Sequence, residues 1–365
     1  EADLDKLRAA MAWARGDHCS DPLLAAKIPV ALQGFFAMRG RLHEGREHLR
    51  LAAELPAVQQ TDVARAHTLY AGAALAHVQG YPVEAQQMLR ECLALRRKLQ
   101  DDEGTAGTLS TLAMTLQSAG ESADAQAAAE EARELFERIG NRLGLAIVQM
   151  QLGHVFVYLG RWDAARRSTQ QALALAREIK HLETEGECEW LLGEIAQSDG
   201  DSSVAHAHVQ RALQRSADAG DRNGEARAKG SLGRLVLEQG ELDAARSALG
   251  SALRAYVAFE MRSEMIDGLE DHADLAEAMD QVELAVRLRA AAAVARQEIG
   301  FVPSPDRQLR ADGRLSDLRA RLDDAVFEAA VKAGLGWPLK QALDAALALA
   351  PVADAAEKAA ALAAA

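Results

Sequence analysis

The chain has 365 residues, of which 49% are hydrophobic and only 4% aromatic, and its formal net charge is −13. A protein that grips nucleic-acid phosphates or an anionic membrane surface needs a basic stripe, and this charge balance opposes both. The three cysteines are far apart and lack Cys-x-x-Cys spacing, so they predict neither a disulfide framework nor a zinc site. No apolar run approaches the roughly 18 residues of a membrane span, and the sparse cysteines favour a cytoplasmic protein.

The first sixty residues predict helices that do not yet follow a clear repeat. Apolar residues recur at helical spacing from Leu4 to Arg15 and from Pro29 to Arg39. The chain opens on Glu1 without a methionine and reads as helix almost at once, which favours a piece cut from a longer protein. We assign residues 1–60 to N-terminal helices and a first atypical repeat.

Residues 61–300 carry an internal repeat with a period of forty residues. Glycines and alanines mark it in one register, at Gly40, Gly80, Gly120, Gly160, Gly200 and Gly240 and at Ala85, Ala125, Ala165, Ala205, Ala245 and Ala285. Glycine adopts the left-handed conformation that ends a helix, and small residues let two antiparallel helices approach closely. The pattern therefore predicts helix pairs that stack to bury one continuous core.

The register weakens after residue 260, where Asp280 stands in the place of a glycine. The segment Phe301-Val-Pro-Ser-Pro is a clear break. Beyond it, residues 301–351 predict a helical cap with helices from Leu309 to Ala333 and from Leu339 to Leu349. The alanine-rich tail at residues 352–365 is expected to be frayed.

Each unit resembles the tetratricopeptide repeat. The matching residues in one unit are Leu152-Gly153, Phe156, Gly160, Ala165 and Ala172. The proline that usually ends the second helix is missing, and the unit is lengthened from the usual thirty-four residues to forty. The resemblance and the periodicity together predict an all-α protein, a right-handed α-solenoid of tetratricopeptide-like helix pairs with a helical C-terminal cap.

The order of the segments resembles a larger family as well. An opening Leu4-Asp-Lys-Leu-Arg-Ala-Ala-Met-Ala-Trp-Ala precedes Phe35-Phe-Ala-Met-Arg-Gly-Arg, the repeats, and a closing Phe327 to Leu347. This looks like the C-terminal helical arm of bacterial STAND-type signal-transduction ATPases that act as transcription regulators. The resemblance implies a sensor of an effector or partner that restrains an upstream ATPase domain of the same polypeptide. The chain has no G-x-x-x-x-G-K-[ST] loop, so we assign it neither ATP nor DNA binding.

The first helix of each pair is expected to line the concave face, where a partner would bind. Aromatic, Met and Arg side chains are enriched at binding hot spots. The candidate groove residues are Tyr70, His77, Met114, Gln117, His154, Tyr158, Trp190, Glu194 and Arg234. An alternative is that the aromatic residues among them pack against the neighbouring helix. The acidic far end of this face favours a cationic or zwitterionic segment, or is simply a solvated helix face.

We find no constellation that supports catalysis, and we expect no metal or cofactor. His206 and His208 do not form a metal site, because residues two apart on a helix point to different faces. Three non-enzymatic readings remain open. The first is a protein-, peptide- or effector-binding sensor domain of a larger regulator. The others are a free-standing adaptor or peptide receptor that mediates protein–protein interaction, and a structural self-assembly module.

Overall fold

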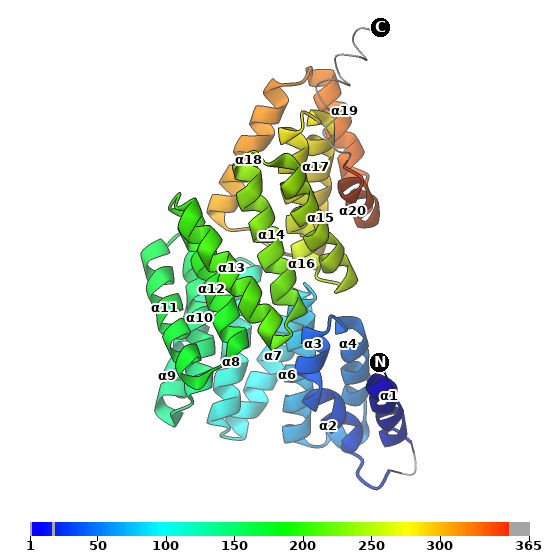
Figure 1. The fold of residues 1–365 in the computed structure, drawn as a ribbon. Helices are drawn as coiled ribbons and strands as arrows, with labels where there is room; N and C mark the ends of the chain where they lie inside the picture. Colours follow the sequence, from blue (N-terminus) through cyan, green and yellow to red (C-terminus); the bar gives the residue numbers. More distant parts are fainter. Residues whose placement is uncertain (1, 17–18, 350–365) are drawn as a thin grey trace.

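The computed structural model describes residues 2–16 and 19–349. Over these ranges the chain forms twenty helices and no strand, arranged as an α-solenoid (Figure 1). The predicted tail at 352–365 and the last two residues of the predicted cap lie outside the described residues. None of the described helices combines the length and apolar character that a bilayer crossing requires. The predicted division of the chain at residues 60 and 300 stays a prediction.

Short helices form the N-terminal region. They are α1 (Ala2–Ala14), α2 (Leu24–Ala31), α3 (Gln33–Met38), α4 (Leu42–Ala53) and α5 (Pro56–Gln59). The single helix expected from Pro29 to Arg39 is wrong, because the backbone at Leu32 has φ −90° and ψ 2° and separates α2 from α3. Phe36, Leu42 and Leu49 pack with Leu75 of the next helix in a small core.

Six helix pairs follow, and they confirm the predicted repeat. The pairs are α6 (Asp62–Val78) with α7 (Pro82–Lys98), α8 (Asp102–Ser118) with α9 (Ser122–Ile139), α10 (Arg142–Tyr158) with α11 (Trp162–Ile179), α12 (Leu182–Ser198) with α13 (Ser202–Ala219), α14 (Arg222–Glu238) with α15 (Leu242–Ala258), and α16 (Arg262–Ala278) with α17 (Val282–Ile299). Each helix packs mainly on its two neighbours in the chain. The array is therefore held together by local contacts, as solenoids are.

The turn geometry persists where the sequence register weakens. Asp280 has φ 61°, close to the 68° of Gly160 at the equivalent place. Aspartate tolerates the left-handed region better than most residues with a Cβ atom. The helix pair α16–α17 is therefore built like the earlier pairs.

Short polar side chains start the first helix of several pairs. The side-chain oxygens of Asp101, Asn141 and Asp221 accept hydrogen bonds from the amide of the residue three positions later, at 2.9, 2.8 and 3.0 Å. These N-caps satisfy amides that the helix itself leaves unpaired. The first helices of these pairs therefore begin with capped amides.

Within a pair, small residues are required where the two helices cross. A Cβ atom on Gly153 of α10 would lie 2.4 Å from Thr169 Oγ1 of α11 and 3.0 Å from a methyl group of Leu191. Real Cβ atoms do not approach that closely, so a larger residue would push the backbones apart. This confirms the role expected for the small residues of the repeat.

The solenoid turns back on itself, so that early and late units touch. The side-chain amide of Asn223 donates to the Ala37 carbonyl at 2.8 Å, and Arg262 Nη1 donates to the Tyr81 hydroxyl at 2.8 Å. The Val302 amide donates to the Ser118 carbonyl at 2.8 Å. Figure 1 shows α3, α6 and α7 directly below α14 and α16.

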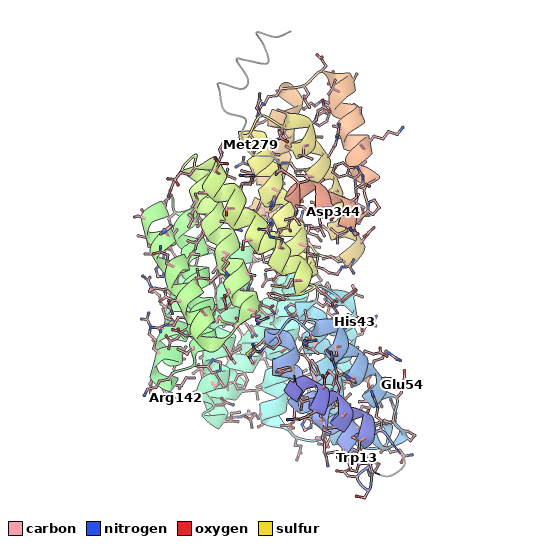
Figure 2. All side chains as sticks on the ribbon, turned by 45° about the vertical axis from the view of Figure 1, so that its right-hand side comes forward. Trp13, His43, Glu54, Arg142, Met279 and Asp344 are labelled. Atoms are coloured by element: carbon pink, nitrogen blue, oxygen red, sulfur yellow. The ribbon has the colours of Figure 1, made fainter. Side chains whose placement is uncertain are left out.

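The C-terminal cap consists of α18 (Pro305–Ala320), α19 (Asp324–Leu335) and α20 (Leu339–Leu347). The helix expected from Leu309 to Ala333 is thus interrupted at residues 321–323. Helices α19 and α20 pack on α17 through Phe327, Ala330 and Leu343. In α18 only Leu318 is buried. Figure 2 shows Trp13 of α1 and Asp344 of α20 near opposite ends of the molecule.

Candidate functional site

The repeat places equivalent residues of successive first helices beside one another on the concave face. Side-chain contacts between these helices therefore join residues about forty positions apart. Thr111 contacts Tyr70, Ser231 contacts Trp190, and Arg227 contacts Glu187 in this way. The candidate site is thus a set of rows that run across the helices α6, α8, α10, α12, α14 and α16.

The part of the concave face on α6, α8 and α10 is neutral. Thr111 Oγ1 donates to the Tyr70 hydroxyl at 3.3 Å, and Thr115 Oγ1 lies 3.4 Å from His77 Nδ1. Burial, with a smaller contribution from the nearby His154, lowers the pKa of His77 to about 4. His77 is therefore an uncharged hydrogen-bonding group at neutral pH.

Two further candidates from the sequence lie on α8 in this neutral part. Met114 is partly exposed, and its side chain is available on the concave face. The side-chain oxygen of Gln117 is buried without a hydrogen-bond partner. A buried acceptor of this kind is costly unless a ligand or water supplies a donor.

Trp190 of α12 stands at the centre of the next part of the surface. Its ring stacks on His154 with 5.9 Å between ring centroids, and the Arg227 guanidinium lies 5.2 Å from the ring centroid. Its indole N–H donates to Ser231 Oγ at 3.0 Å. The indole is thus fixed in orientation by neighbours on α10 and α14, yet remains partly exposed.

Glu187 links the two residues that flank Trp190. His154 Nε2 lies 3.1 Å from Glu187 Oε1, and Arg227 Nη1 donates to the same oxygen at 2.9 Å. Burial would raise the pKa of Glu187, but Arg227 and His154 outweigh it and hold the pKa at about 2. Glu187 is therefore charged throughout the physiological range.

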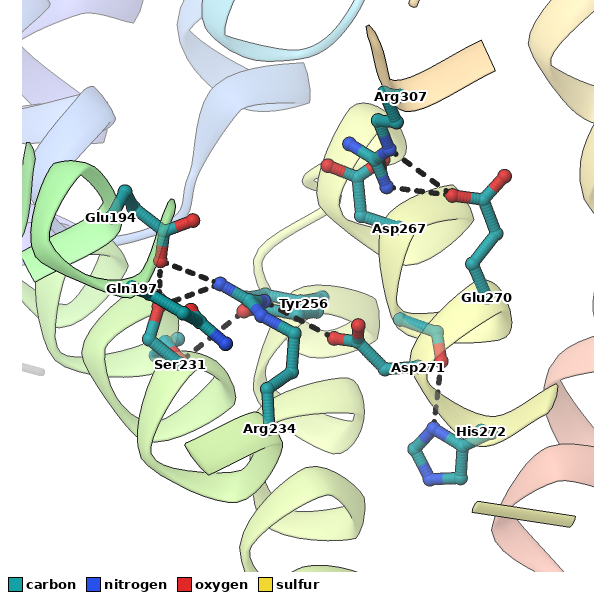
Figure 3. Close-up of polar contacts among 12 residues, drawn as sticks. Glu194, Gln197, Ser231, Arg234, Tyr256, Asp267, Glu270, Asp271, His272 and Arg307 are labelled. Atoms are coloured by element: carbon teal, nitrogen blue, oxygen red, sulfur yellow. Dashed lines mark hydrogen bonds and ion pairs between the residues drawn. The ribbon is translucent and has the colours of Figure 1, made fainter. Parts of the chain in front are cut away.

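Arg234 of α14 forms a second polar cluster (Figure 3). Its Nη2 donates to Glu194 Oε1 at 2.7 Å and to Ser231 Oγ at 2.8 Å, and its Nη1 lies 3.4 Å from Asp271 Oδ2. Burial raises the pKa of Asp271 to about 7, although Arg234 and Arg307 oppose the shift. Since Ser231 also accepts from Trp190, the two clusters form one network.

The cap contributes to the same surface through α18. Arg307 Nη2 lies 2.7 Å from Asp267 Oδ1 and 2.7 Å from Glu270 Oε2 on α16 (Figure 3). Further along, Arg314 Nη1 lies 3.7 Å from Asp274 Oδ1. Because α18 has so few buried residues, these ion pairs are its main attachment to the concave side of α16.

The network contains residues that the sequence reasoning missed as site members, above all Ser231, Asp271 and Arg307. The sequence does indicate part of this network, because charged residues recur every forty residues at two positions of the repeat. Charges alternate in sign along Glu187, Arg227, Asp267 and Arg307, and along Glu194, Arg234, Asp274 and Arg314. Alternation at one repeat position predicts ion pairs between neighbouring units, since equivalent residues lie side by side.

The candidate residues from the sequence do not form one continuous patch. His154, Trp190, Glu194 and Arg234 share the network, whereas Tyr70 and His77 bond to α8. Tyr158 is only 9% exposed, and its hydroxyl donates to the Pro303 carbonyl at 3.2 Å. The segment before α18 therefore covers Tyr158. Within the described ranges, no cluster of His, Cys, Asp and Glu could hold a metal ion.

The fold and this surface define the class of protein as a tetratricopeptide-like solenoid. Residues 104–178 match the family model of the tetratricopeptide repeat. A search of curated protein sequences found no match.

Solved structures share the fold over most of the chain. A Rap protein complexed with Competence and Sporulation Factor has a TM-score of 0.64 at 13% identity, covering 93% of this chain and 95% of that one. The Rap conjugation gene regulator of the plasmid pLS20, in complex with a Phr peptide, has a TM-score of 0.55 at 12% identity over 92% and 82%. NprR in complex with its cognate peptide NprX has a TM-score of 0.54 at 13% identity over 73% and 78%. At these identities the similarity establishes the fold alone.

Proposed function

We propose that this chain is a non-catalytic regulatory module that binds a peptide, or an extended segment of a protein partner, on the concave face around Trp190. The observation that carries the proposal is the indole itself, held between His154 and Arg227 and still partly exposed. A pre-oriented aromatic side chain loses little conformational freedom on binding, which favours it as an anchor. The peptide complexes of two structural neighbours support the same class of ligand.

The surrounding charges favour a ligand with at least one cationic group. Asp267, Glu270 and Asp271 lie within one turn of α16, and Asp274 and Glu277 follow on the next turn. A cationic side chain or an N-terminal amine of the ligand would replace one of the arginines that pair with these carboxylates. Separate apolar side chains of the ligand would cover Trp190 on α12 and Met114 on α8, and a donor would satisfy the side-chain oxygen of Gln117.

A peptide selection tests this proposal. Random peptides displayed on phage are selected on the wild-type chain, and the recovered peptides are titrated by fluorescence anisotropy. Trp190→Ala is expected to weaken binding at least about tenfold, as for a hot-spot residue. Trp13→Ala is the control, since Trp13 is 56% exposed and lies at the edge of the molecule (Figure 2). Equal loss in both variants, or no loss in either, contradicts a site at Trp190.

We further propose that the module acts in the cytoplasm as the sensor arm of a larger signalling ATPase and transcription regulator. The order of the opening segment, the repeats and the closing segment supports this assignment. The test is to sequence the coding DNA immediately upstream of Glu1. An in-frame P-loop domain supports the arm. A start codon just before Glu1 leaves a free-standing adaptor or peptide receptor. A stable dimer that occludes the concave face would instead favour a self-assembly module.

A further inference from the structure

The outer face of the solenoid carries a depression between α11 and α13, opposite to the concave surface. An open cavity of about 380 Å³ is lined by Gln170, Leu173, Ala174, Arg177, Glu189, Leu192, His208 and Arg211. A second cavity of about 350 Å³ adjoins it and shares Gln170, Leu192 and His208. Volumes of about 300–1,000 Å³ are typical of sites for small ligands.

A buried carboxylate gathers three basic side chains at the edge of this cavity. Glu189 of α12 is 2% exposed. Its Oε1 accepts from Arg177 Nη2 at 2.7 Å, and its Oε2 lies 2.7 Å from His208 Nδ1 and accepts from Arg211 Nε at 2.9 Å. The carboxylate therefore fixes the positions of groups that come from two other helices.

This cluster departs from the repeat in which it sits. The positions equivalent to Glu189 hold Leu109, Gln149, Lys229 and Leu269. The positions equivalent to Arg177 and Arg211 in the unit before it hold Glu137 and Gln171. The fold therefore does not require these charges, since neighbouring units stack without them. Burying a carboxylate costs several kcal/mol before its partners compensate, which makes this departure hard to attribute to stability.

The basic groups have hydrogen-bonding capacity beyond Glu189. A guanidinium carries five N–H groups, and Glu189 takes one from each arginine. The side chains of Arg177 and Arg211 are 56% and 48% exposed, so much of each guanidinium faces the solvent at the cavity. In the first cavity two arginines stand against one glutamate, whereas the adjoining cavity adds Arg166 together with Asp199 and Asp201. The positive charge is therefore concentrated at Arg177 and Arg211. Leu173, Ala174 and Leu192 supply an apolar wall beside them.

We propose that this cavity is a binding site for a small amphipathic anion, with a carboxylate or phosphate headgroup on Arg177 and Arg211 and an apolar body against Leu173 and Leu192. Glu189 holds both guanidinium groups in place, and His208 Nδ1 lies 2.8 Å from Arg211 Nη2. The site is independent of the concave surface, because Glu189 and Glu187 are two residues apart on α12 and point to different faces. An effector could therefore bind here while a peptide occupies the concave face.

Isothermal titration calorimetry on the whole chain at neutral pH tests the site with octanoate, octyl phosphate, octylammonium and 1-octanol. We expect saturable binding of one or both anions, and neither octylammonium nor 1-octanol should bind comparably. Tighter binding of octanoate identifies a carboxylate ligand, and tighter binding of octyl phosphate identifies a phosphate. The double variant Arg177→Gln/Arg211→Gln is expected to lower the affinity at least about tenfold, as expected for charge-assisted hydrogen bonds.

Two more variants test whether binding needs the space of the cavity and whether it needs these particular arginines. Ala174→Trp fills the cavity from its exposed edge without changing charge, and we expect it to abolish binding. Arg97→Gln is the matched control at the repeat-equivalent position of Arg177, where the arginine pairs with Glu131 at 2.7 Å. It should bind like the wild type. The proposal fails if neither anion binds at millimolar concentration, if 1-octanol or octylammonium binds equally well, or if both cavity variants bind normally.

Discussion

The two halves of the concave face are built from helix pairs of the same kind, but their side chains differ in chemistry. On α6, α8 and α10 the inward residues are hydroxyl, imidazole and apolar groups, as in the contacts of Tyr70 with Thr111. On α12, α14 and α16 they are ion pairs that cross from one unit to the next, such as Arg227 with Glu187. A repeat can therefore keep its backbone while the side chains at one position change from neutral to alternately charged.

The difference has energetic consequences. A neutral hydrogen bond contributes about 1 kcal/mol net, whereas removing one partner of a buried ion pair costs about 3–5 kcal/mol because the other charge stays buried. Partly exposed pairs fall between these values. Substitutions in the charged half are therefore expected to cost more stability. A ligand that exchanges ion-pair partners there would change contacts between several units.

The largest effect is expected for Arg227→Met. The variant leaves Glu187, which is largely buried, with His154 as its remaining partner, and removes the guanidinium from the face of Trp190. We expect a loss of about 2–3 kcal/mol in the free energy of unfolding, measured by urea denaturation. A loss no greater than that of Tyr70→Phe would remove the distinction between the two halves.

Asp271 in the charged half and His77 in the neutral half should contribute to stability in opposite pH directions. The pKa of Asp271 is raised to about 7, so its contribution to stability is complete below about pH 4 and is lost as the pH rises to about 7. The pKa of His77 is lowered to about 4, so its contribution is complete above about pH 6.5 and is lost as the pH falls to about 4. Hydrogen exchange of α16 and α6, corrected for intrinsic rates, measures both local stabilities.

Variants at these two residues give the pH experiment its controls. Asp271→Asn should reduce the loss of protection in α16 between about pH 4 and 7, because the amide does not ionise. The remaining loss is expected from Glu264 of the same helix, whose pKa is raised to about 7 by burial. His77→Gln should remove the loss in α6 as the pH falls from about 6.5 to 4. If α6 and α16 change in parallel in the wild type, the solenoid opens as one unit and the two halves are not separable.

A smaller effect is expected for Tyr70→Phe in the neutral half. The variant removes the hydroxyl that lies 3.3 Å from Thr111 Oγ1, while the Thr111 hydroxyl keeps the Gly107 carbonyl as its acceptor. The ring stays in place beside Arg96, whose guanidinium lies 5.2 Å from the ring centroid. We expect a loss of about 0.5–1 kcal/mol by urea denaturation. A loss above about 2 kcal/mol would mean that this half is as strictly specified as the charged one.

The smallest effect is expected for Arg314→Ala on α18. The Arg314 side chain is 52% exposed and lies 3.6–3.7 Å from its two acidic partners. Exposed pairs of this kind contribute about 0–1 kcal/mol, so the melting temperature should barely change. Arg307→Ala is the comparison, since Arg307 contacts Asp267 and Glu270 at 2.7 Å. Equal effects of the two variants would mean that the short ion pairs of Arg307 contribute no more to the attachment of α18 than the exposed pairs of Arg314.

The sequence by itself determined the repeat architecture of this protein. The forty-residue ladders identify the helix pairs and their turns, because helix capping and close helix approach are local requirements with few suitable residues. The short-range breaks were less predictable. The kink at Leu32 coincides with no glycine or proline at that position. The break at residues 321–323 does have a local signal, because Asp323 at the N-cap of α19 is a residue type favoured there.

Only the tertiary structure decided which inward residues come together in the candidate site. It buried Tyr158 under the segment at Pro303, brought Ser231 and Asp271 into one network with Trp190, and placed Arg307 of α18 on α16. These contacts depend on how far the solenoid rotates from unit to unit and where it returns on itself. A small rotation per unit accumulates over many units, so residues more than a hundred positions apart meet only in the complete superhelix.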